Sequence, residues 1–410
     1  MANTLLTPSI ITKETVRLFK NSNALLKMVD TQYDDQFANS GAKIGNTLRI
    51  RLPNDYAVRT GPTAVVQNTI ETNTLLTIGS QIGVDISFSM ADRTLTIDQY
   101  SSRYIRPAVN KLAGYMAADL MQVAETTSNF VHNVDTGGNT IPPTANTWLR
   151  AGAVLDNYGA PRDQRNIVLS PFTQANTVSS LSGLFNSQAK ISSQYTTGMM
   201  GMDVLGFDWA MDQTVIRHQT AAYGVLPTVN GAGQFGAAIT VTALAGPLNK
   251  GDFVQFAGVY NVNRVTNASS GALAMFVVTA ATPAGATSIP IYPALTPPTV
   301  VAGLTGSAYQ TVTNSPANGA QVTSPVNAGE LVTKNLAFRP EAFTLATADM
   351  ELPRGVHEAH RENQDGISVR LVTAYNISTD QMVTRLDILY GWAAVRPEWA
   401  VIVGDVGIQG

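Results

Sequence analysis

Apolar residues near the start of the chain recur at helical spacing. Leu18, Leu25 and Val29 fall on one face of a helical pattern, which the polar run Asn21-Ser22-Asn23 interrupts. We therefore predict an N-terminal arm of short amphipathic helices over residues 1–44.

Between residues 45 and 90 the period changes to two. Apolar and polar residues alternate at 47–52 and again at 84–89, which predicts two antiparallel strands. The stretch between them, 53–79, is rich in Thr and Asn and has few residues to form a core. Because a two-stranded loop of this kind is marginally stable alone, we expect it to lie against a partner surface.

The longest apolar stripe of the chain follows this loop. Apolar residues from Ile105 to Val123 step by three or four positions and predict a long helix that follows Asp92 and ends near Thr127. Pro107 marks a kink or a late start of that helix. The pattern then predicts a helix near 147–158, a buried strand at 166–170 and a helix that begins at Pro171.

Composition changes sharply in the second half of the chain. Between residues 220 and 333 the only charged residues are Lys250, Asp252, Arg264 and Glu330. Short apolar runs recur there between Gly, Pro and Asn turns, for example at 239–241, 253–256, 276–278 and 288–292. Such spacing is typical of a small β-barrel or sandwich, and we predict an inserted all-β domain. Strands are predicted again at 336–353 and 367–403, separated by a charged loop at 354–366.

Overall composition excludes several classes of protein. The 410 residues contain no cysteine, so disulfides and thiolate metal sites are excluded. A net charge of −3 argues against a dedicated duplex-DNA binder. Only 13% of residues are charged, which fits either a surface covered in an assembly or a Thr/Asn-coated all-β protein. Neither a membrane-spanning apolar run nor a signal peptide is visible.

Candidate catalytic chemistry is sparse. His357, Glu358 and His360 form a His-Glu-Ala-His run, which is either a solvated charged loop or, with histidines three apart, a metal site. Asp135-Thr136-Gly137 is interpreted as a turn. Lys250-Gly251-Asp252 is interpreted as a strand-entry turn, with receptor binding as the alternative. Because no phosphate-binding loop, Rossmann glycine pattern or nucleophile elbow is present, we expect no enzyme activity, no bound metal and no cofactor.

Three short stretches carry a resemblance to a known family. Residues 250–259 are similar to a Gly-Asp-x-x-x-Phe-Ala-Gly-Val strand and turn, and residues 389–398 to a Tyr-Gly-x-x-x-x-Arg-Pro-Glu run. Leu205-Gly206-Phe207-Asp208 also matches. With the order of the predicted elements, the chain resembles the major capsid proteins of tailed bacteriophages with the Hong Kong ninety-seven capsid fold. Within them it resembles the podovirus coat-protein branch that carries an inserted β-barrel domain.

The resemblance implies an α+β fold with named parts. These are an N-terminal arm at 1–44, an extended β-hairpin loop at 45–90, a peripheral domain with a long spine helix at 91–200, an axial domain at 201–218 and 335–410, and an inserted β-barrel domain at 219–334. The inserted domain would stabilise the subunit and help contacts between capsomers.

The resemblance also implies a function and partners. The chain would self-assemble through a procapsid, in the cytoplasm of the bacterial host, into the icosahedral shell of the virion. Its partners would be further copies of itself in pentamers and hexamers, a separate scaffolding protein, a portal protein at one vertex, and packaged double-stranded DNA without sequence-specific contact. No membrane and no catalysis are implied.

Basic residues on the loop and the Arg-Pro-Glu run are candidate subunit contacts. Arg49 and Arg51 alternate on one face of their strand, where they form either a solvated edge or a charged contact with a neighbour. The candidate set is Arg49, Arg51, Asp55, Arg59, Arg396 and Glu398.

Two further expectations concern assembly. Some phages of this fold class join the extended loop to a neighbour through a lysine isopeptide bond, but no lysine lies between Lys43 and Lys111. We therefore expect mature particles to show no ladder of covalent multimers on a denaturing gel. Because the predicted fold begins within the first 44 residues, we also expect scaffolding to be a separate protein.

Two other classes of function are alternatives. A secreted or surface adhesin-like protein could be built around the β-rich region, but it would need an export signal. A metal-assisted hydrolase would use His357, Glu358 and His360. Metal analysis and electron microscopy distinguish these alternatives from a capsid protein.

Overall fold

The computed structural model describes residues 23–31, 47–53, 56, 62, 72–89, 106–181, 203–264, 266–298, 309–364, 367–378 and 381–406. The chain divides into two compact units, each continuous in space but not in sequence. The first unit comprises residues 1–50, 73–120 and 343–395, and the second comprises 51–72, 121–342 and 396–410.

The first unit is built on a five-stranded sheet and one long helix. Its elements are α2 (Ala24–Met28), β1 (Thr47–Arg51), β2 (Asn73–Thr77), β3 (Ser80–Ser89), α5 (Arg106–Leu120), β18 (Phe343–Thr347), β19 (Glu358–Gln364), β20 (Ile367–Asn376) and β21 (Gln381–Ala394). The sheet has the order β18-β21-β20-β19, and β3 also pairs with β21. All these pairings are antiparallel.

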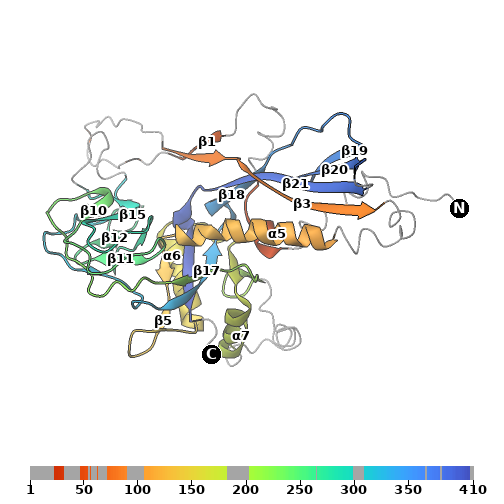
Figure 1. Ribbon diagram of the computed structural model, residues 1–410. Helices are drawn as coiled ribbons and strands as arrows, with labels where there is room; N and C mark the ends of the chain where they lie inside the picture. The colour runs from red at the N-terminus through yellow and green to blue at the C-terminus, as the bar shows by residue number, and fades with distance from the viewer. Residues whose placement is uncertain are drawn as a thin grey trace. The chain divides into compact units, whose positions relative to one another are not determined.

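Helix α5 confirms the predicted long helix, and it lies beside β3 and β21 (Figure 1). Its buried stripe includes Val109, Leu112 and Met116. Pro107 lies in the first turn, where a missing N–H leaves no intrahelical bond unmade. At the other end, the Asp119 carboxylate accepts hydrogen bonds from the Tyr390 hydroxyl (2.9 Å) and from Trp392 Nε1 (3.0 Å). These two bonds attach the helix to β21.

The predicted pairing within the 45–90 loop is wrong. Strand β1 pairs with β2, which lies in the stretch 53–79 between the two predicted strands. Strand β3 pairs with β21 instead, from Ser80 opposite Tyr390 to Ser89 opposite Gln381. The physical reason is the length of the partner, since the ladder of β3 with β21 has ten residue pairs whereas β1 has only five residues.

The charged loop expected at 354–366 is also wrong in part. Residues 358–364 form β19, which pairs with β20 at the edge of the sheet. Charged side chains on an edge strand discourage further strand pairing, so the charge pattern suits a strand that is solvated on one side.

Of the predicted arm, the structure describes residues 23–31. Asn23 caps α2 through its side-chain oxygen, which accepts hydrogen bonds from the backbone N–H groups of Leu25 (2.9 Å) and Leu26 (3.4 Å). Both leucines are buried. After the helix, the Asp30 carbonyl accepts a hydrogen bond from the Leu345 N–H (2.9 Å), so the segment joins β18. The remainder of the arm, 1–22 and 32–44, lies outside the described residues.

The second unit contains a mixed sheet covered by helices. Its elements around this sheet are η3 (Met121–Glu125), β4 (Phe130–Val131), β5 (Asn133–Val134), β6 (Thr140–Ile141), α6 (Ala145–Asn157), β7 (Asn166–Leu169), α7 (Pro171–Leu181), β8 (Asp208–Met211), β9 (Arg217–Gln219), β17 (Leu331–Phe338), η4 (Pro340–Ala342), η5 (Pro397–Trp399) and β22 (Ala400–Asp405). The sheet order is β4-β22-β17-β7-β8, with β9 also on β17. Helices α6 and α7 and strand β7 confirm the predicted elements.

A second sheet lies in the sparsely charged part of the same unit (Figure 1). Its strands, in the order β10-β15-β14-β11-β16, are β10 (Gly236–Thr240), β11 (Phe253–Phe256), β14 (Phe276–Val278), β15 (Ser288–Leu295) and β16 (Val322–Thr323), with β12 (Tyr260–Val262) and β13 (Ser269–Leu273) as a separate pair. Buried residues from Tyr223 to Val322 form one hydrophobic cluster here, including the rings of Phe256 and Phe276. The predicted short strands are confirmed.

Candidate functional site

Arg49 and Arg51 lie on the exposed face of β1. Both side chains are exposed, whereas Ile50 between them is buried in a cluster with Leu76 and Ala346. The alternation of the strand therefore separates a buried apolar face from a basic exposed face. Asp55 and Arg59, the other two candidates on this loop, lie outside the described residues.

Arg396 lies on the ring of Trp399. Its guanidinium carbon is 4.2 Å from the centre of the indole ring, and its backbone N–H donates to the Ala342 carbonyl at 3.1 Å. This geometry is a cation–π contact, which holds the guanidinium in one place. Within the described part of the chain, no carboxylate pairs with it.

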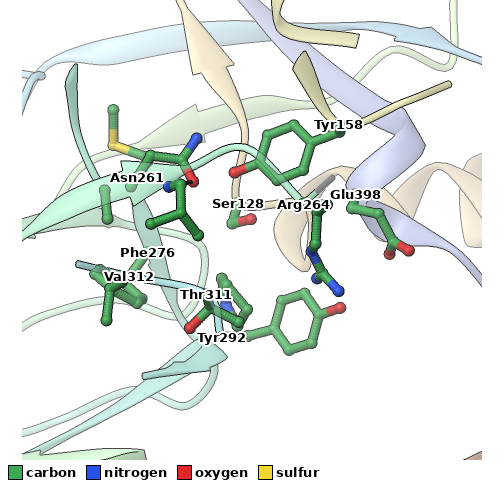
Figure 2. A pocket seen from close by; sticks show the side chains of 13 residues that line it. Ser128, Tyr158, Asn261, Arg264, Phe276, Tyr292, Thr311, Val312 and Glu398 are labelled. Carbon is green, nitrogen blue, oxygen red and sulfur yellow. Dashed lines mark hydrogen bonds between the residues drawn. The ribbon is translucent and has the colours of Figure 1, made fainter. Parts of the chain in front are cut away.

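Glu398 lies two residues further on, in the same turn, and lines a pocket. Figure 2 shows it beside Arg264 and the rings of Tyr158 and Tyr292. Its backbone carbonyl accepts a hydrogen bond from Asn129 Nδ2 at 3.1 Å. Burial raises the pKa of both tyrosines, and the negative charge of Glu398 raises each of them further.

A buried polar cluster lies where the β-rich segment leaves the mixed sheet. Lys334 on β17 is fully buried, donates to the Gly251 carbonyl at 2.7 Å, and has its Nζ 4.9 Å from the centre of the Phe253 ring. Burial lowers the pKa of Lys334 to about 8, although the nearby charges of Glu125 and Asp252 act in the opposite direction.

Asp252 completes this cluster. One carboxylate oxygen lies 2.8 Å from His218 Nε2, and the other accepts hydrogen bonds from the N–H groups of Asn249 (2.7 Å) and Ala221 (3.3 Å). Gly251 has a φ of +92°, and a Cβ there would stand 3.0 Å from Lys334 Nζ, so only glycine fits. The Lys250-Gly251-Asp252 run is thus a structural turn, and its buried aspartate is not presented to a receptor.

The sequence did not single out Trp399, Lys334 or His218 for these roles. Of the three, only Lys334 could have been found from the sequence. It lies within a run of strand residues that are mostly buried, and a buried lysine needs a hydrogen-bond or ion-pair partner.

The His357, Glu358 and His360 run, the candidate metal site of the hydrolase alternative, lies at and within a strand instead of in a loop. His360 lies within β19 and His357 just before it, and on an extended chain residues three apart point to opposite faces. Among the described residues, no group of three or more His, Cys, Asp or Glu side chains is placed to hold a metal ion. The described helices also include none with the length and hydropathy of a membrane span.

Comparison with known proteins gives one match across the chain. A family model described as "P22 coat protein - gene protein 5" matches residues 1–407. No curated protein sequence matches.

Several solved structures are distantly similar. A structure titled "Mycobacterium phage Che8" covers 93% of this chain and 90% of its own, with 11% identity and a TM-score of 0.47. One titled "Asymmetric unit of bacteriophage PhiM1 mature capsid" covers 90% and 84%, with 10% identity and a TM-score of 0.44. "Crystal structure of virus-like particle from Pyrococcus furiosus" covers 96% and 97%, with 8% identity and a TM-score of 0.41. Likenesses this distant do not by themselves assign a fold or a function.

Proposed function

The chain belongs to the P22 coat protein family, whose model matches residues 1–407, and from this premise we propose how it builds a virus shell. It is a major capsid protein of a tailed bacteriophage and a component of the virion shell. The family is structural, and the adhesin-like alternative is not favoured. The family match is the observation that carries this conclusion.

We propose that the subunit has the Hong Kong ninety-seven-type capsid fold with an inserted β-barrel at 219–334. The five-stranded sheet of that segment and its own hydrophobic cluster support the insertion. Strands β9 and β17, which bound the segment, pair with each other from Gln219 opposite Leu331 to Arg217 opposite Thr333. The two ends of the segment are therefore adjacent, as an inserted domain requires.

For assembly, we propose pentamers and hexamers of this chain, a separate scaffolding protein, a portal protein at one vertex, and packaged double-stranded DNA that is bound without sequence-specific contact. The low content of charged residues, 13%, supports a surface that is largely covered by neighbours.

Negative-stain electron microscopy tests the proposed function. The protein would be expressed alone and together with the neighbouring reading frames of its genome. Closed shells or curved sheets of pentamers and hexamers are the expected result. Discrete small particles under every condition would contradict it.

The basic face of β1 is proposed to contact a neighbouring subunit. Replacing both Arg49 and Arg51 with glutamate should leave the monomer folded, since both side chains are exposed. Because opposed like charges at an interface cost several kcal/mol, shell yield in sedimentation should fall about ten-fold or more. Circular dichroism checks the monomer.

The matched control is the replacement of the same two arginines with lysine, which keeps the charge. If the glutamate variant assembles as well as the lysine variant, the two arginines form a solvated edge instead of a contact.

A further inference from the structure

The turn around η5 carries two opposite charges that have no ion-pair partner in the described part of their own subunit. Arg396 precedes the turn and Glu398 lies within it, and both are partly exposed. Ionised side chains that are half removed from water and left unpaired are unfavourable. Their partners are therefore expected on another molecule.

The contrast with Arg339 shows that the lack of a partner is specific to Arg396. Arg339 also lies near Trp399, with its guanidinium carbon 5.6 Å from the ring centre. It pairs with Glu341 at 2.8 Å and Asp163 at 3.3 Å. Arg396 has the closer ring contact, at 4.2 Å, and no carboxylate. A guanidinium held over an indole ring has lost much of its rotamer freedom, so a carboxylate can bind it at a low cost in entropy.

Glu398 offers such a carboxylate. It lines the pocket of Figure 2 with Arg264 and with Tyr158 and Tyr292, whose rings are half-buried. Neither carboxylate oxygen has a hydrogen bond from a described residue, and the only bond of this residue to a described side chain is made by its backbone carbonyl. A charge-assisted bond to a guanidinium would satisfy it.

We propose that the η5 turn is a self-complementary contact between two copies of this chain, in which Arg396 of each copy pairs with Glu398 of the other. Two opposite charges separated by one residue, Pro397, satisfy each other reciprocally when a two-fold axis passes near the turn, because residue i then meets j and j meets i. This inference rests on the capsid function and names one contact of the shell.

A charge-swap experiment tests the pairing in the full chain. The variants are Arg396→Glu, Glu398→Arg and the double variant with both changes. Each single variant opposes like charges and should lower the yield of closed shells about ten-fold or more, whereas the double variant restores opposite charges and should recover most of the yield. Shells are quantified by sedimentation and electron microscopy, and monomer folding by circular dichroism.

Two controls keep the result specific. Arg150→Glu makes the same change at an exposed position of α6 and should assemble normally. Glu398→Gln removes a carboxylate that has no hydrogen-bond or ion-pair partner among the described residues of its own subunit, so it should leave the monomer melting temperature unchanged and still lower the shell yield. This variant keeps the test valid if Arg396→Glu alone disturbs the packing of Trp399.

The outcomes distinguish this inference from the function it rests on. Wild-type protein without shells under any condition would contradict the capsid function. Wild-type shells together with full assembly of Glu398→Gln and Glu398→Arg would overturn the pairing alone. Folded single and double variants that all fail equally would also overturn it, because the charges would then face a partner of another kind, such as a scaffolding protein.

Discussion

Replacing Gly391 with alanine should destabilise the first unit more than the same change at any other glycine that the structure describes in this unit. A Cβ at this position of β21 would overlap the carbonyl oxygen of Thr77 and lie 2.8 Å from its carbonyl carbon and 2.9 Å from the Ile78 Cα. All of these are backbone atoms, which cannot move aside as a flexible side chain can. We expect a loss of about 3 kcal/mol in the free energy of unfolding, measured by urea denaturation followed through tryptophan fluorescence.

Gly114 provides the matched control. It lies within α5, and no atom lies within 4 Å of a Cβ added there. Gly114→Ala should therefore stabilise the protein by about 0.5 to 1 kcal/mol through helix propensity alone. Equal urea midpoints for Gly391→Ala and the wild-type protein would show that β21 and the Thr77–Ile78 segment are further apart than described.

Raising the pH from about 7 to about 9.5 should stabilise the second unit through Lys334. Its pKa is about 8 in the folded protein and 10.5 without burial, so the unfolded state binds more protons in this window and stability rises with pH. The rise due to this lysine is on the order of 2 kcal/mol. The titratable groups that face it are Asp252, His218, Glu125 and Lys250.

Lys334→Met isolates this contribution, because it removes the proton and retains most of the side-chain volume. The stability of this variant, measured as a urea midpoint at each pH, should lack the lysine-dependent rise. Lys250→Met, which removes a half-exposed lysine of the same cluster, should keep it. Parallel pH profiles for the wild-type protein and Lys334→Met would contradict the assignment.

The useful pH range ends near about pH 10. Above it, tyrosines whose pKa is raised in the folded protein, such as Tyr292, lower the stability because they ionise first in the unfolded chain.

Local periodicity predicted most elements correctly. Residues 106–123 of the predicted helical stripe lie in α5 and η3, and residues 166–169 of the predicted apolar run form β7. In the β-rich segment, the alternating and apolar runs became strands at the expected positions. These elements depend on side chains close in sequence, which is the information that a periodic pattern contains.

Strand pairing was less predictable, because it depends on which partners are present elsewhere in the chain. Strand β3 alternates as clearly as β1, but its partner β21 lies some 300 residues away, with Ser89 opposite Gln381. The run 358–364 has the composition of a loop and becomes a strand because β20 offers it an edge. No local sequence pattern predicts the pairing of β3 with β21 or of residues 358–364 with β20.

The candidate contact residues divide in the same way. Arg49 and Arg51 were placed on one face of a strand by alternation, and the structure exposes both. Arg396 and Glu398 were chosen from the family resemblance. The contact of Arg396 with the Trp399 ring, and the lack of a carboxylate partner for Arg396 among the described residues, become visible only in the structure. The cluster around Lys334 unites residues of η3, β9, the turn before β11, and β17, so spacing in the sequence could not reveal it.

The place of β22 in its sheet has a consequence for synthesis on the ribosome. This strand lies between β4 and β17, and Asn129 beside β4 donates a hydrogen bond to Ala400, 271 residues later. At the usual rate of translation, the nascent chain needs on the order of tens of seconds to cover that distance. Throughout this time β4 lacks its partner strand, and β17, once it has been made, lacks β22 as well, so the growing chain is most exposed to aggregation before its native sheet can close.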